Sequence, residues 1–134
     1  MPPQALTLDD IVAHEGLFHP VDHVIVGFDD DRRAAEAAAA LRDAGIAASD
    51  IVQYTSAQWH PALQRRIEES PRSAGFGYEI TLMRRYEELA RAGAGWLAVH
   101  LSDDTAAPRV TEVAERHGAR TAVRYHRLAS EDLI

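Results

Sequence analysis

The chain has 134 residues, the length of a single domain, and a domain of this size buries enough surface to hold a core without cross-links. It contains no cysteine, which excludes disulfide bonds, thiolate metal sites and cysteine nucleophiles. Acidic residues number 21 against 14 basic ones, for a formal net charge of -7, and the basic residues are scattered, so we expect no binding of nucleic acid.

The N-terminal segment shows no targeting signal. It has no basic region followed by an apolar run, and no stretch of the chain reaches the ~18 apolar residues of a membrane span. We therefore expect a cytoplasmic protein that has no membrane partner. Residues 1–22 are predicted to form an N-terminal arm with a short helix from Thr7 to Gly16, and residues 23–134 a single domain.

The predicted domain begins with a strand, an acidic turn and a helix that ends at a glycine. The apolar run from Val24 leads to Asp30 and Asp31, which are placed to cap the free N–H groups of the helix. Gly45 follows the helix, and glycine is the residue that most readily takes the left-handed conformation at this point. A second strand is predicted over residues 50–54.

Two further helices are predicted in the middle of the chain. The first covers residues 56–70, with Trp59 and Leu63 on one stripe, and the second covers residues 78–92. Together they form an inserted helical hairpin, about 56–92, that we expect to cover an edge or the second face of a sheet.

The opening pattern recurs without gaps in the segment that begins at Leu97. The matched pairs include Val26 with Val99, Asp30 with Asp103, and Gly45 with Gly118. A last strand is predicted over residues 121–126. Two βαβ units of this kind form the ferredoxin-like fold, a four-stranded antiparallel sheet of strand order 4-1-3-2. The predicted fold class is therefore α/β (α+β), ferredoxin-like, with the layout βαβ-αα-βαβ.

The same regions resemble a known family. The run YEELARAGAGWLAVHLSDD, which contains Tyr86, Glu87, Gly93 and Gly95, is similar to the corresponding region of the general stress protein 17M-like (heat-induced stress protein) family. The run that begins at His23 resembles the first unit of that family. The resemblance implies a ferredoxin-like fold and an association with bacterial stress responses, and it brings no catalytic residues.

Strand alternation predicts one candidate site. The side chains expected under the two repeat helices are Val24, Val26, Phe28, Leu97, Val99, Leu101, Val123 and Tyr125. His23, His100 and His126 then fall on the opposite face, at one end of neighbouring strands ~5 Å apart. Three neutral imidazoles with an open fourth position are typical of a zinc, nickel or iron site, which Arg124 or an N-terminal histidine would complete.

Other interpretations of the same residues remain open. Histidines near strand ends are often half-exposed or bonded to a backbone carbonyl, and one register slip would separate the three. His14 and His19 are interpreted as loop histidines. The acidic run Asp29–Asp31 matches the ligands of Mg²⁺, but the second repeat has similar acids at the same helix start, and helix capping explains both and is the preferred interpretation.

Three functions follow from these expectations. The leading interpretation is a small stress-associated protein without enzymatic activity, which forms a homodimer or binds a partner through its open sheet. The second is a sensor that binds a metal or small molecule at the histidine cluster. The third is a dimeric α/β-barrel enzyme that uses His100 or His126 as its general base.

Overall fold

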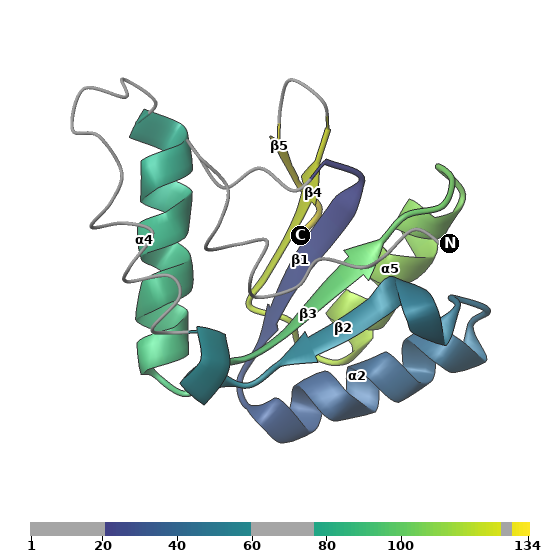
Figure 1. The fold of residues 1–134 in the computed structure, drawn as a ribbon, viewed down its shortest axis with the longest axis horizontal. Coiled ribbons are helices and arrows are strands. Elements are labelled where there is room, and N and C mark those ends of the chain that lie inside the picture. Colours follow the sequence, from purple (N-terminus) through teal and green to yellow (C-terminus); the bar gives the residue numbers. More distant parts are fainter. Residues whose placement is uncertain (1–20, 60–76, 127–129) are drawn as a thin grey trace.

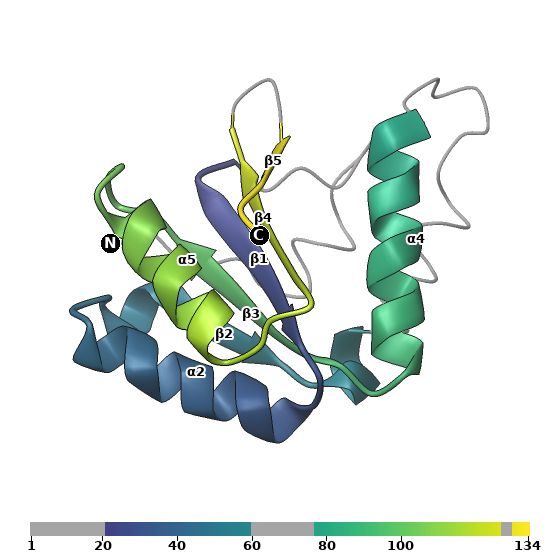
Figure 2. The same ribbon diagram turned by 180° about the vertical axis from the view of Figure 1, so that it is seen from behind.

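The computed structural model describes residues 21–59, 77–126 and 130–134, and these residues form three layers around one antiparallel sheet (Figure 1). Helices α2 and α5 lie on one face of the sheet, and α4 lies on the other, which is clear in both views (Figure 2). The elements are β1 (His23–Phe28), α2 (Asp31–Asp43), η1 (Ala48–Asp50), β2 (Ile51–Tyr54), α4 (Gly77–Arg91), β3 (Gly95–His100), α5 (Ala106–Arg116), β4 (Thr121–Tyr125) and β5 (Ser130–Asp132). None of the described helices has the length and apolar character needed to cross a membrane.

The sheet has five strands in the order β2-β3-β1-β4-β5. The expectation of four strands is corrected by β5, which pairs antiparallel with β4 and covers its outer edge. The sequence analysis missed β5 because its three residues, Ser-Glu-Asp, have low β-propensity and show no apolar alternation. Strands β1 to β4 keep the predicted order, and every pairing between them is antiparallel.

The helix predicted after the turn at Asp30 and Asp31 forms where its signals placed it, whereas the short helix predicted from Thr7 to Gly16 lies outside the described residues. The Asp30 side chain accepts a hydrogen bond from the backbone N–H of Arg33 at 2.8 Å, as expected of an N-cap. Gly45 follows the end of α2 at a φ of +97°, a conformation that L side chains rarely adopt. The apolar stripe of α2 is buried against the sheet at Ala34, Ala37, Ala38 and Leu41.

The matching helix of the second repeat begins differently. Thr105 is the N-cap residue of α5 and makes no side-chain capping bond. The Asp103 carboxylate instead accepts from the N–H of Thr105 at 2.9 Å and from its hydroxyl, which closes a turn before the helix. The same acidic position therefore supports the turn in the second unit and the helix in the first.

An aromatic core joins α4 to the sheet. Trp59 stacks on Trp96 with ring centroids 5.4 Å apart, and Tyr86 meets Trp96 edge-on at 5.2 Å. The hydroxyl groups of Tyr86 and Tyr125 lie 2.8 Å apart in the buried interior. These rings are packing groups of the core between α4 and the sheet. Of the predicted helix 56–70, residues 56–59 are helical and the rest lies outside the described residues.

The predicted facing of the fourth strand is wrong. Val123 and Tyr125 pack on the α4 side together with Ile25, while Ala122 packs on the α2 and α5 side with Val26. The pairing of Ile25 with Val123 sets this orientation, because partners in an antiparallel ladder point to the same face. Four of the five residues of β4 are buried, so the sequence carried no alternation to reveal it.

Candidate functional site

His23 and His100 are direct partners across β1 and β3. The backbone N–H of Leu101 donates to the carbonyl of Asp22 at 2.7 Å, so the hydrogen bonds flank the two histidines and do not join them. Partners at such a non-hydrogen-bonded position have the closer side chains of the two kinds of antiparallel pair. The imidazole centroids are 5.1 Å apart and the rings meet edge-on, and we refer to these two residues as the histidine pair.

His23 is buried, with 8% of its surface exposed. Its Nδ1 lies 2.9 Å from the carbonyl oxygen of Val21, and because a carbonyl only accepts, this nitrogen carries the proton. Burial lowers the pKa of His23 below 6.5, and the neighbouring His100 lowers it further, although the hydrogen bond to Val21 opposes the shift. The ring is therefore neutral near pH 7, and its Nε2 presents a lone pair.

That lone pair has no partner in the described part of the chain. Nε2 of His23 is buried and receives no hydrogen bond there. An unsatisfied buried acceptor costs on the order of 1–3 kcal/mol, so such atoms in a native fold call for an explanation such as a bound group. The expected alternative, a strand-end histidine bonded to a backbone carbonyl, accounts for Nδ1 and leaves Nε2 bare.

His100 is held by a carboxylate that the sequence analysis did not identify. Its Nδ1 lies 3.3 Å from Oδ1 of Asp50, and both side chains are mostly buried, at 16% and 13% exposure. Asp50 closes η1 just before β2, and the pairing of Ile51 with Val99 brings it beside the end of β3. The signal was available in principle, because the antiparallel pairing of the second and third strands places residue 50 next to residue 100.

His126 does not join the histidine pair. Its Nε2 lies 2.9 Å from Oε1 of Glu131 on β5, and its side chain is 42% exposed. Within residues 21–59, 77–126 and 130–134, no three side chains of the types His, Cys, Asp and Glu gather closely enough to hold a metal ion. The structure thus brings together two of the three predicted ligands, and His14 and His19 lie outside the described residues.

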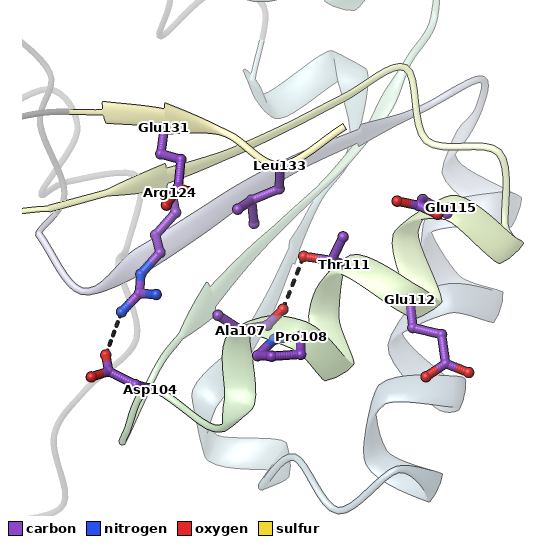
Figure 3. A pocket seen from close by; sticks show the side chains of 9 residues that line it. All are labelled: Asp104, Ala107, Pro108, Thr111, Glu112, Glu115, Arg124, Glu131 and Leu133. Atoms are coloured by element: carbon purple, nitrogen blue, oxygen red, sulfur yellow. Dashed lines mark hydrogen bonds and ion pairs between the residues drawn. The ribbon is translucent and has the colours of Figure 1, made fainter.

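Arg124, which was expected to complete the histidine cluster, lies on the face of α5. Its guanidinium donates to Asp104 at 2.6 Å (Figure 3). The ion pair borders an open hollow of about 470 Å³ between α5, β4 and β5. The hollow is lined by Asp104, Ala107, Pro108, Thr111, Glu112, Glu115, Arg124, Glu131 and Leu133. Its four carboxylates outnumber the single arginine, which itself is already paired.

The aspartates considered for magnesium have structural partners. Asp29 accepts from Arg120 at 2.5 Å, and Asp30 caps α2. Asp31 accepts from the backbone N–H of Ser56 at 3.1 Å and so connects α2 to the segment after β2. Of the three aspartates, Asp30 has the capping contact that was expected, and the other two bond to groups outside α2.

Comparisons with protein-family models, with curated proteins and with solved structures found no match. The site is therefore interpreted from its own chemistry. A neutral imidazole with a bare, buried Nε2 beside a second imidazole held by a carboxylate is suited to bind an electron-deficient partner, either a proton donor or a metal ion.

Proposed function

We propose that the protein is a small binding protein of the sensor type, whose ligand contacts the histidine pair. The observation that carries this proposal is the Nε2 atom of His23, which is buried and lacks a hydrogen-bond donor among the described residues. A ligand that supplies a donor or a cation to this atom would remove the cost of leaving it unsatisfied.

The fixed orientation of the two imidazole rings supports the same proposal. Both histidines extend from paired strands of the sheet, and each has its Nδ1 engaged, by Val21 in one case and by Asp50 in the other. Rings held in this way lose little conformational freedom when a ligand binds, so more of the interaction energy is retained as affinity. His100 remains partly exposed, which leaves a path for a ligand from solvent.

A thermal-shift screen of the full, untagged chain tests this proposal. A compound that binds only the native state raises the melting temperature, with a stabilisation of about 2.7 kcal/mol at a concentration of 100 times its Kd. We expect the shift to be lost in His23→Phe and His100→Phe and kept in His126→Phe, which alters an exposed histidine. A shift of equal size in all three variants would place the ligand elsewhere.

A second candidate function is self-association, and the edge of the sheet favours it. Among the described residues, strand β2 has a partner strand on one side only, and its Ile51 and Val52 are partly exposed. The outward backbone groups of such a strand are available to pair with another chain. A second copy joined across a twofold axis would extend the sheet through β2.

We also propose that strands β1 to β4 and the helices α2 and α5 form a ferredoxin-like domain, to which β5 and α4 are additions. The strand order and the two repeated βαβ units support this assignment. The relation to the general stress protein 17M-like family, with its association with bacterial stress, is a proposal that the resembling residues alone support.

A further inference from the structure

The orientation of the two rings narrows the class of ligand. In metal sites, a histidine ligand almost always donates its second ring N–H to a carboxylate or a backbone carbonyl, which fixes the tautomer and the direction of the ring. His100 uses Asp50 in this way, and His23 uses the carbonyl of Val21. Both rings thus have the outer contacts of metal ligands, with the two Nε2 atoms left to coordinate.

The spacing of the rings also fits a shared ion. With a metal–nitrogen bond of about 2.1 Å and about 1.1 Å from nitrogen to ring centre, two imidazoles on a tetrahedral ion have centroids about 5.2 Å apart. The centroids of the histidine pair are 5.1 Å apart. The backbone register that produces this distance is part of the sheet, so the pair is set before any ion arrives.

We infer that the histidine pair binds a divalent transition-metal ion through the Nε2 atoms of His23 and His100, with Asp50 as the outer carboxylate. Neutral imidazole suits zinc, nickel and copper, whereas magnesium and calcium require oxygen ligands. This inference rests on the proposed function and names its ligand class.

The coordination of that ion is incomplete within the described residues. No third side chain of a ligating type joins the pair there, so water or the donor atoms of a small chelating molecule take the remaining positions. An ion with open positions suits a sensor, because the bound molecule is exchangeable. It also predicts weaker binding than in structural zinc sites, which have four protein ligands.

Isothermal titration of the metal-free, untagged full chain with Zn²⁺ and with Ni²⁺ tests the inference. We expect His23→Ala and His100→Ala each to weaken binding at least about 10-fold, and Asp50→Asn to weaken it by about 10-fold or more through the outer contact. His126→Ala and His117→Ala are the matched controls and should retain wild-type affinity. Circular dichroism checks that each variant is folded. If His23→Ala does not fold, the loss of affinity in Asp50→Asn tests the inference in its place.

A second measurement reports on the atoms themselves. In ¹⁵N-labelled protein, Zn²⁺ should shift the Nε2 resonances of both rings and leave their Nδ1 protons in place. Failure of the folded wild-type chain to bind either ion, or affinity that depends on His126 and not on the pair, would overturn the metal inference. If the chain binds no metal but a non-metal compound still stabilises it through His23 and His100, the metal inference is wrong and the proposed function holds. If no compound stabilises it through these residues, both the metal inference and the proposed function are wrong.

Discussion

At the scale of single residues, the two nitrogens of His23 have opposite surroundings, and this difference gives the site its character. Nδ1 donates to Val21, while Nε2 is enclosed without a donor among the described residues. The position of His23 at the start of a strand was predictable from the apolar run that follows this residue. The carboxylate that orients its neighbour His100 is remote in sequence, and only the exact register of β2 against β3 identifies it as Asp50.

The lowered pKa of His23 predicts how stability depends on pH. Above the ordinary value of 6.5 the ring is neutral in both the folded and unfolded states, and its contribution is fully present. As the pH falls below 6.5, the unfolded chain takes up a proton that the buried ring resists, so the free energy of unfolding decreases until the folded-state pKa is passed. The neighbouring carboxylates of Asp22 and Asp50 oppose the lowering of the His23 pKa, and the neighbouring His100 reinforces it.

Urea unfolding between pH 7.5 and about 5 measures this dependence. His23→Gln, which removes the titrating ring, should lose less stability over that range than the wild type. His126→Gln should lose at least as much as the wild type, because His23 is unchanged in it. Parallel curves for the wild type and His23→Gln would contradict the assignment of a lowered pKa to this residue.

At the scale of elements, the helices were predicted more faithfully than the facing of the strands. The stripe of α2 and its cap at Asp30 follow from a 3.6-residue period and a local hydrogen bond. Strand β4 is buried on both faces, so whether Val123 or Ala122 points to α4 depends on its partner strand. Because β4 faces the opposite way from the prediction, His126 is separated from the histidine pair.

At Gly95, the close approach of β3 to the start of α2 leaves no room for a side chain. A Cβ added there would lie 2.5 Å from the carbonyl oxygen of Asp30 and 2.6 Å from Cα of Asp31, both backbone atoms at the start of α2. We expect Gly95→Ala to lower the free energy of unfolding by about 1–3 kcal/mol, since either β3 or α2 must move. The urea midpoint measures the loss.

Gly93→Asn is the matched comparison. Gly93 has a φ of +98° and no neighbour within 4 Å of an added Cβ, and asparagine tolerates the left-handed region better than most residues. Its substitution should cost less than that of Gly95. The opposite ranking would show that the approach of β3 to α2 is not the constraint.

At the scale of the whole molecule, three layers leave the sheet open at the β2 edge within the described residues. The sequence predicted an inserted hairpin that covers a face or an edge, and the described part, α4, covers the face. The homodimer remains a prediction. If it forms through β2, a positive charge on that edge should oppose it, because the two copies bring the charge to one axis.

Light scattering coupled to size exclusion at micromolar concentrations measures the mass. We expect a dimer for the wild type and a shift toward monomer for Gln53→Lys, which alters an exposed side chain of β2. Ala39→Lys adds the same charge on the exposed face of α2 and should leave the mass unchanged. A monomeric wild type would remove the self-association candidate.

The amino-acid sequence by itself determined the repeat, the positions of α2 and α5 and the order of strands β1 to β4, because capping, periodicity and chain connectivity are local properties. Only the tertiary structure decided which side of the sheet β4 presents, where the fifth strand pairs and which carboxylate meets His100. Each of these depends on contacts between residues far apart along the chain, and a shift of one residue in a strand reverses every side chain in it.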